Sequence, residues 1–281
     1  MRAVESNKPP KERICYDPLA RQLVNPFYYL LTKLFAGYGS WRAPGTIEFL
    51  IARCRYIDDY LQTCLDDGLK QLVIMGAGLD SRAYRFKQLS NVYVFEVDLP
   101  ATQKDKRRRL FKIFGELPRQ VTFVPLDFNE ESLGKLQNFG YRKQRKTLFI
   151  WEGVTYYLES GAVDKTLDFV VHNSGEGSSI IFDYVYASAL SASKKRGEIA
   201  RMQRYERFTG EGLIFGIEEG EVEEFLDRRG YTGIENATGE DLKSAYFTGP
   251  NRDRPIATVY AIVYATIKSP KLSSERKIDF N

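Results

Sequence analysis

The stretch VIMGAGLDSRAYRF, residues 73–86, joins a short apolar run to a glycine-containing turn and then to a basic, aromatic segment. An apolar run that breaks into glycines is typical of a buried strand followed by a turn into a helix. Gly76 and Gly78 permit a tight turn and, lacking a Cβ, let the backbone approach a ligand. Dinucleotide-binding loops carry a third glycine at the position of Ser81. A turn into a helix, capped by Asp80 or Ser81, explains the loop almost as well as a ligand site does. The stretch therefore predicts a strand-turn-helix unit and leaves its ligand open.

The rest of the chain repeats this alternation of short apolar runs with polar, helix-favouring segments. The expected strands are residues 71–75, 92–97, 121–126, 147–151 and 178–185, and the expected intervening helices are 81–89, 103–116, 130–138 and 160–172. A short helix is expected within 220–231, and a final strand over 256–267 is expected to pair near 231–235. This alternation predicts an α/β fold with a doubly wound, Rossmann-like sheet.

Two segments fall outside the alternation. Residues 16–69 precede the first strand and are expected to form several helices, an N-terminal helical cap. Residues 187–212 interrupt the core and are expected to form a helical lid over the carboxyl edge of the sheet. We expect a single domain over 1–281, with its core in 70–186 and 213–268 and a polar tail over 269–281 that lacks structure.

The charge balance does not indicate a strongly basic surface of the kind that binds nucleic acid. There are 41 basic and 37 acidic residues, a formal net charge of +4, which is far from the footprint of a nucleic-acid-binding protein. The basic run KDKRRRL, residues 104–110, is expected on the solvated outer face of a helix. The longest apolar-leaning stretch, residues 25–38, contains Lys33 and is too short to span a bilayer. No apolar signal core stands at the start of the chain, so we expect a cytoplasmic protein that binds neither nucleic acid nor membrane.

The cysteines do not suggest a disulfide framework or a metal site. Cys15, Cys54 and Cys64 are odd in number and have no metal-binding spacing. We expect three reduced thiols and no bound metal.

Polar or aromatic residues follow each of the next three expected strands. Asp98 ends the second strand about 20 residues after the glycines, where an acidic side chain can accept hydrogen bonds from ribose hydroxyls. Asp127 and Phe128 end the third strand and suit an exocyclic amine and a purine face, and Glu152 follows the fourth. A helix cap at Asp98 or a bare turn explains each position singly. Together with the glycine loop after the first strand, however, polar groups end four consecutive strands, and this favours an adenosine site.

The segments VIMGAGLDSRAYRF, VFEVDLP, PLDF and FIWEGVTYYLESGAV occur in an order and spacing that resemble the leucine carboxyl methyltransferase family. The resemblance is greatest to its bacterial-type branch of S-adenosylmethionine-dependent O-methyltransferases that act on small molecules, and it runs from about residues 51–61 to 214–231. It implies a class I methyltransferase fold, with a seven-stranded sheet whose last strand is antiparallel. It also implies S-adenosyl-L-methionine as cofactor and S-adenosyl-L-homocysteine as product.

The resemblance further implies a set of cofactor contacts. The methionine part of the cofactor would lie against Gly76, Ala77 and Gly78, and the ribose would be held by Asp98 with Leu99. The adenine would be framed by Asp127 and Phe128. The cofactor carboxylate would pair with Arg53, and its amino group would lie near Glu152. Arg55, two residues from Arg53, is the alternative partner of the carboxylate.

The choice of methyl acceptor depends on whether the site holds a base. The single histidine, His172, is expected at the solvated end of a helix, on the side of the sheet opposite the site, so no histidine base is expected. Phenols and alcohols usually need deprotonation, whereas a carboxylate is ionised at neutral pH. We therefore expect a small-molecule carboxylate or acidified phenol, with Tyr156, Tyr157 and Tyr184 as candidate pocket residues and core packing as the alternative for each.

Other functions remain open at this point. The family also includes enzymes that methylate the C-terminal carboxylate of a protein, and a cofactor-binding regulator without methyl transfer would keep the same pocket. A nicotinamide-dependent oxidoreductase is disfavoured by Ser81 and by the WEG element at residues 151–153. The chain is expected to be a monomer or a homodimer.

Overall fold

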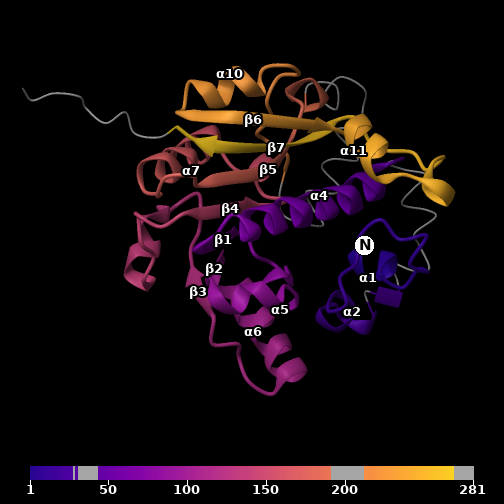
Figure 1. Ribbon diagram of the computed structural model, residues 1–281, viewed down its shortest axis with the longest axis horizontal. Coiled ribbons are helices and arrows are strands. Elements are labelled where there is room, and N and C mark those ends of the chain that lie inside the picture. The colour runs from indigo at the N-terminus through magenta and orange to yellow at the C-terminus, as the bar shows by residue number, and fades with distance from the viewer. Residues whose placement is uncertain (28, 31–43, 191–211, 269–281) are drawn as a thin grey trace, which may run out of the picture.

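The computed structural model describes residues 1–27, 29–30, 44–190 and 212–268. A seven-stranded sheet in the order β3-β2-β1-β4-β5-β7-β6 runs through its centre (Figure 1). The strands are β1 (Gln71–Met75), β2 (Tyr93–Asp98), β3 (Val121–Pro125), β4 (Thr147–Trp151), β5 (Ser179–Val185), β6 (Tyr231–Thr238) and β7 (Tyr260–Ile267). Neighbours among β1–β5 are parallel, and β7 is antiparallel to both β5 and β6. The doubly wound sheet and its antiparallel last strand are therefore confirmed.

The strands follow the apolar runs of the sequence closely. All five residues of β1 and of β4 are buried, as expected for strands covered on both faces, whereas edge strand β3 is only partly buried. The final strand begins at Tyr260, four residues later than expected. Residues 256 and 257 pack instead on the start of a helix, where Ala257 N–H donates to Gly45 O (3.0 Å).

Helices cover both faces of the sheet, and successive strand residues point to opposite faces. Leu72 and Ile74 face a core formed with α4 (Thr46–Asp66), α5 (Arg82–Arg85) and α11 (Gly239–Tyr246). Val73 and Met75 face the other core, formed with α7 (Ser160–His172) and α10 (Val222–Asp227). Helix α6 (Pro100–Phe114) lies against β3 and against α2 (Ala20–Leu23), and α1 (Arg2–Glu5) packs on α2 (Figure 1). The short 3₁₀ segments are η1 (Lys87–Asn91), η2 (Leu133–Phe139), η3 (Thr155–Tyr157) and η4 (Gly249–Asn251).

Two expected helices are shorter than the sequence suggests. The segment 81–89 divides into α5 and η1 because Phe86 adopts an extended conformation. The segment 130–138 forms only the 3₁₀ helix η2, since Asp127 Oδ1 and Ser132 Oγ accept from nearby backbone N–H groups of Asn129 and Gly134 (2.9 and 3.2 Å). Such local side-chain hydrogen bonds compete with an α-helix.

The basic run of α6 is solvated over only part of its length, because Arg109 is partly buried and donates to Leu23 O (2.7 Å). Lys104, Arg107 and Arg108 are exposed, but Lys106 is buried, with its Nζ 2.8 Å from Oε2 of buried Glu96 on β2. Burial of the Lys106 ammonium is possible because Glu96, on another element, supplies the opposite charge. The residues of the run on α6 give no sign of this partner.

Of the expected cap over 16–69, the structure describes α2 and α4. The expected lid lies largely outside the described residues, as does the expected tail, and the single-domain organisation stays a prediction. None of the described helices has a stretch that is both long and apolar enough to cross a membrane. Cys15, Cys54 and Cys64 are free, buried thiols, as predicted.

Candidate functional site

The glycine loop lies directly after β1, where the strand order reverses between β1 and β4. Ligands of open α/β sheets bind at such a switch point. Gly76 and Gly78 both have left-handed backbone conformations, with φ of 65° and 40°. A Cβ on Gly76 would lie 2.2 Å from Val154 Cγ2, so packing alone requires glycine there, whereas the nearest atom to a Cβ on Gly78 is Gly76 O at 3.7 Å. At Gly78 the positive φ, rather than a close neighbour, favours glycine.

Asp98, at the end of β2, is tied to this loop. Its Oδ2 accepts a hydrogen bond from Gly78 N–H (2.5 Å), and its Oδ1 accepts one from Leu99 N–H (2.7 Å). Burial raises the pKa of Asp98 despite these two backbone donors. The contact between Gly78 and Asp98 orients the carboxylate at the expected cofactor edge.

A cavity of about 460 Å³ opens beside the loop, at the carboxyl ends of β1 and β4. Its walls come from four parts of the chain: the N-terminal residues, α4, the end of β1 with the glycine loop, and the segment after β4. The lining residues are Met1, Arg2, Leu50, Arg53, Ile74, Met75, Gly76, Ala77, Gly78, Leu79, Asp80, Glu152, Gly153 and Tyr156. This volume lies within the range of about 300–1,000 Å³ typical of small-molecule sites. The cavity brings together Arg53, the glycine loop and Glu152, which sequence analysis proposed as one site.

Arg53, from α4, bridges two carboxylates across the cavity wall. Its Nη2 lies 3.0 Å from Glu152 Oε1, and its Nη1 donates to Oδ2 of Asp183, a fully buried residue of β5. Asp183 Oδ1 also accepts from Gly153 N–H (2.7 Å), which ties the segment after β4 to β5. Arg55 points elsewhere: its side chain is half exposed and pairs with Asp59 (2.8 Å). Of the two arginines, only Arg53 is therefore placed to meet a ligand.

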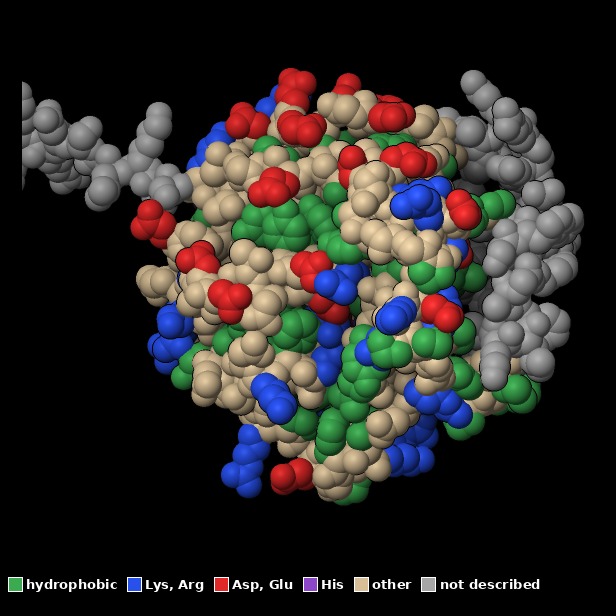
Figure 2. Space-filling view, turned by 45° about the vertical axis from the view of Figure 1, so that its right-hand side comes forward, with side chains coloured by type: hydrophobic (Ala, Val, Ile, Leu, Met, Phe, Trp, Pro, Cys, Tyr) green, Lys and Arg blue, Asp and Glu red, His purple; other side chains and the backbone are tan. Residues whose placement is uncertain are grey.

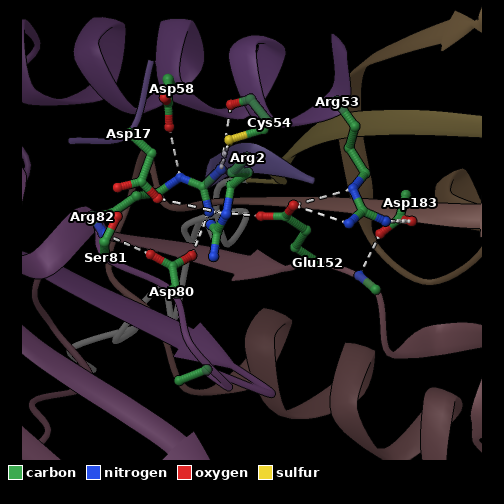
Figure 3. Close-up of polar contacts among 12 residues, drawn as sticks. Arg2, Asp17, Arg53, Cys54, Asp58, Asp80, Ser81, Arg82, Glu152 and Asp183 are labelled. Atoms are coloured by element: carbon green, nitrogen blue, oxygen red, sulfur yellow. Dashed lines mark hydrogen bonds and ion pairs between the residues drawn. The ribbon is translucent and has the colours of Figure 1, made fainter. Parts of the chain in front are cut away.

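Arg82, on α5, is the main site residue that sequence analysis missed. Its guanidinium is fully buried, donates to Asp58 Oδ1 (2.7 Å) and Glu152 Oε2 (2.6 Å), and also donates to Asp80 (Figure 3). Burial by itself would raise the pKa of Glu152, but the charges of Arg82 and Arg53 outweigh it and hold that pKa well below its usual range. The only signal for Arg82 was its place directly after the glycine loop, because a lone arginine early in a helix normally indicates a solvated position.

The N-terminal residues close the site from one side. Arg2 Nη2 donates to Leu79 O in the glycine loop (2.8 Å), and Arg2 Nε lies 3.5 Å from Asp17 Oδ2 (Figure 3). Nothing in the local sequence around Arg2 indicates this contact, which joins residues 77 positions apart.

Asp127 and Phe128 lie at the same edge of the sheet but do not line the cavity. The chain reaches them directly after Leu126, whose N–H donates to Asp98 O (2.9 Å). Asp127 Oδ1 accepts from Asn129 N–H (2.9 Å), and the Phe128 ring packs against Trp151 with centroids 6.1 Å apart. The structure therefore places these two residues beside Asp98, while their expected contact with adenine stays a prediction.

The candidate tyrosines occupy different environments. Tyr156 lines the cavity, with its hydroxyl 3.5 Å from Arg53 Nη1, and Tyr157 packs edge-on against its ring with centroids 4.7 Å apart. Tyr184 is fully buried in the core and donates to Asn236 Oδ1 (3.2 Å), so it does not line the cavity. His172 ends α7 with an exposed side chain beside Asp168, before the start of β5 and away from the carboxyl edge.

Sequence comparisons show which known proteins this chain is similar to. A family model described as leucine carboxyl methyltransferase matches residues 1–171. YktD of Bacillus subtilis (strain 168), named as an S-adenosyl-L-methionine-dependent methyltransferase, is 32% identical over 216 residues, which cover 76% of this chain and 70% of YktD. A Mycobacterium sp. (strain JLS) protein with the same kind of name is 30% identical over 190 residues, which cover 65% of this chain and 61% of that protein.

Similarity to solved structures is more distant. An O-methyltransferase family protein from Burkholderia thailandensis has a TM-score of 0.48 at 9% identity and covers 77% of this chain and 57% of its own. A protein from Bordetella parapertussis has a TM-score of 0.48 at 14% identity and covers 96% of this chain and 80% of its own.

Proposed function

The chain belongs to the leucine carboxyl methyltransferase family, and from this premise we propose that it is an S-adenosyl-L-methionine-dependent O-methyltransferase. The proposed acceptor is a carboxylate or acidic phenolic oxygen of a small molecule. The observation that carries the proposal is the cavity at the switch point, which joins the glycine loop to the buried pair of Arg53 and Glu152.

The charges around the cavity suit this cofactor. S-adenosylmethionine carries a sulfonium and an ammonium, both positive, and one carboxylate. Asp80 and Glu152 offer negative charge to the two cations, while Arg2 and Arg53 offer guanidinium groups to the carboxylate. Because Glu152 has a strongly lowered pKa, it stays ionised throughout the neutral range.

Asp98 retains the capacity to bind a ribose. An ionised carboxylate has about four acceptor sites on its two oxygens. Gly78 N–H, Leu99 N–H and the Thr102 side chain use three of these sites, so the carboxylate can accept about one further hydrogen bond from a sugar hydroxyl. The two backbone donors also fix the orientation of the carboxylate before the ligand binds, which lowers the entropic cost of binding.

The residues of the cavity favour an acceptor that is already ionised. When bound, the cofactor supplies an electrophilic methyl group, and the protein must hold the acceptor oxygen in line with it and exclude water. Burial, with the charge of Asp183 added, raises the pKa of Tyr156 above its usual value, so this phenol is protonated at neutral pH and acts as a hydrogen-bond donor rather than a base. His172, the one histidine of the chain, is exposed at the far end of α7. A carboxylate or acidic phenol needs no base at the site.

Isothermal titration calorimetry tests the cofactor. We expect S-adenosylmethionine and S-adenosylhomocysteine to bind and NAD not to bind. Asp98→Ala should weaken cofactor binding about 10- to 100-fold, since a hydrogen bond to a charged group contributes about 1.5–3 kcal/mol. Asp98→Asn, which keeps one oxygen, should weaken it less, and Asp253→Ala, at an exposed site, should not change it. Binding of NAD in preference to S-adenosylmethionine would contradict the proposal.

Release of S-adenosylhomocysteine tests the acceptor. Small carboxylic acids and acidic phenols should give product, and simple aliphatic alcohols should not. Turnover only with peptides that end in a free carboxylate would replace the small-molecule acceptor by a protein C-terminus. Tight cofactor binding without turnover on any of these compounds would favour a regulator that binds the cofactor without transferring its methyl group.

A further inference from the structure

A second cavity, of about 640 Å³, lies at the opposite edge of the sheet from the candidate active site. It is bordered by the residues that lead into β2, β3 and β4, so it lies at the amino ends of these parallel strands. Its lining residues are Ser90, Asn91, Val92, Tyr93, Phe95, Arg119, Gln120, Thr122, Phe139, Gly140, Arg142 and Arg145. Nothing in the proposed methyl transfer uses this cavity.

Three arginines make the lining of the cavity positively charged. Arg119 precedes β3, and Arg142 and Arg145 lie in the turn before β4. None of the described residues that line the cavity is acidic, and within the described ranges no carboxylate forms an ion pair with these three guanidinium groups. Elsewhere on the molecule exposed arginines such as Arg55, Arg108 and Arg228 pair with a carboxylate on their own helix. A concave site with three unpaired guanidinium groups attracts anions.

The turn that carries two of these arginines is rigidly held. The side-chain amide of buried Gln71 donates to Arg142 O (2.8 Å) and accepts from Arg142 N–H (2.9 Å). Arg145 O accepts from Thr147 Oγ1 (2.9 Å) and from Gly175 N–H (3.2 Å). The backbone positions of Arg142 and Arg145 are thus fixed in the free protein, so binding of an anion orders only their side chains.

Aromatic side chains form the other part of the wall. Tyr93 is 57% exposed, and the guanidinium of Arg145 lies over its ring, 4.6 Å from the centroid. This distance is within the limit of about 6 Å for a cation–π contact. Phe95 is buried beneath, and Phe139 is partly buried beside it. A stacked arginine and tyrosine next to apolar rings suits a planar, aromatic group.

We propose that this cavity binds a small phosphorylated molecule with a planar ring, of the nucleoside-phosphate class. The guanidinium groups of Arg119, Arg142 and Arg145 bind the phosphate, for which their planar fork is well matched. Tyr93 and Phe139 contact the ring. The limited volume of the cavity and the small net charge of +4 favour a small ligand over a nucleic-acid strand.

Calorimetry on the full chain tests this site, with guanosine diphosphate, pyrophosphate and guanosine as separate probes. A saturating concentration of S-adenosylhomocysteine is present, so that the cavity at the carboxyl edge is filled. We expect guanosine diphosphate to bind most tightly, pyrophosphate more weakly and guanosine most weakly, because only the first uses both parts of the wall. Arg142→Gln and Arg145→Gln should each weaken guanosine diphosphate binding about 10- to 100-fold.

Lys143→Gln is the matched control. It removes the same charge from the same turn and is exposed like Arg142, but it does not line the cavity, so binding should change less than about twofold. Asp98→Ala should leave guanosine diphosphate binding unchanged whether or not it abolishes cofactor binding, which separates this site from the proposed function. Circular dichroism of each variant checks that the fold is retained.

Three results would overturn the proposal. The first is that guanosine diphosphate shows no binding at millimolar concentration and 0.15 M salt. The second is that Lys143→Gln weakens binding as much as Arg142→Gln, which would indicate a diffuse field instead of a site. The third is that single-stranded RNA binds through Arg142 and Arg145 while guanosine diphosphate does not.

Discussion

Glu152 is the residue on which the candidate active site converges, because it is shared by two guanidinium groups from different helices. Oε1 lies 3.0 Å from Arg53 Nη2, and Oε2 lies 2.6 Å from Arg82 Nη1. The three side chains are almost wholly removed from water, so each charge depends on the others for its stability. Glu152 therefore links α4, α5 and the end of β4 as well as lining the cavity.

Glu152→Gln should reduce the free energy of unfolding by about 3–5 kcal/mol at pH 7, because it leaves buried guanidinium groups with one partner fewer. The pKa of Glu152 is lower in the folded chain than the value of about 4.3 expected when unfolded. Its contribution is therefore complete above that unfolded pKa and is lost as the pH falls towards the folded pKa. Urea unfolding from pH 7 down to pH 3 should show the difference between wild type and Glu152→Gln shrinking as the pH falls.

The exposed residue Glu218 supplies the control for this measurement. Glu218→Gln should leave the free energy of unfolding within about 0.5 kcal/mol of the wild type at every pH. A gap between wild type and Glu152→Gln that stays constant from pH 7 to pH 3 would mean that the carboxylate charge does not stabilise the fold.

Among the elements, α6 does more than cover the sheet. It begins at Pro100, directly after Asp98 and Leu99, and ends at Gly115, whose φ is 79°. Lys106, two turns into the helix, lies 2.8 Å from Glu96 Oε2 and donates to Ala77 O (3.2 Å), while Tyr84 OH donates to Glu96 Oε1 (2.8 Å). One buried ammonium thus ties the helix to β2 and to the glycine loop.

Lys106→Met should lower the free energy of unfolding by about 3–5 kcal/mol, because Glu96 is then buried without a cation. It should also weaken S-adenosylmethionine binding, since Ala77 O loses the donor that holds the loop. Chemical denaturation measures the first effect and calorimetry the second. The double variant Lys106→Met with Glu96→Gln should recover most of the stability but not the affinity. Recovery of both would show that Lys106 has no influence on the loop.

Over the whole molecule, the first cavity lies at the carboxyl ends of the parallel strands and the second at their amino ends. On the face shown in Figure 2, acidic side chains are most frequent in the upper part, over α10 and β6, and basic side chains in the lower part, towards α6. The small net charge of the chain therefore conceals an uneven distribution. The arginine-lined cavity is a separate local concentration of positive charge.

Occupation of the carboxyl-edge cavity should stabilise the molecule as a whole, because its walls come from the N-terminal residues, α4, the loop after β1 and the segment after β4. S-adenosylhomocysteine at 100 times its Kd should add about 2.7 kcal/mol to the free energy of unfolding, which corresponds to a rise in Tm of roughly 5 °C. Differential scanning calorimetry measures the shift. Asp98→Ala at the same ligand concentration should show a smaller rise, and NAD should cause none. An equal rise with NAD would indicate binding without selectivity for the proposed cofactor.

The order and type of the main elements could be predicted because they depend on local patterns. The strands at 71–75 and 147–151 and the helix at 160–172 were located to the residue, since apolar runs bounded by polar segments determine them. The positions of Asp98 and Glu152 at one edge of the sheet could be predicted for a related reason, because the ends of parallel strands meet there, while their contacts with the cofactor stay predictions. The α-helix expected over 130–138 was wrong because side-chain hydrogen bonds within a short polar segment compete with helix formation.

The amino-acid sequence by itself determined the doubly wound sheet and the edge at which a ligand would bind, because periodicity and glycine position are properties of neighbouring residues. The antiparallel last strand was expected only from the resemblance to the leucine carboxyl methyltransferase family. Only the tertiary structure decided which charges are buried. Arg82, Lys106 and Asp183 have ordinary local surroundings in the chain, yet each is buried against opposite charges supplied by other elements. Whether a charged side chain can leave water depends on partners that folding brings from far along the chain, and no local pattern contains that information.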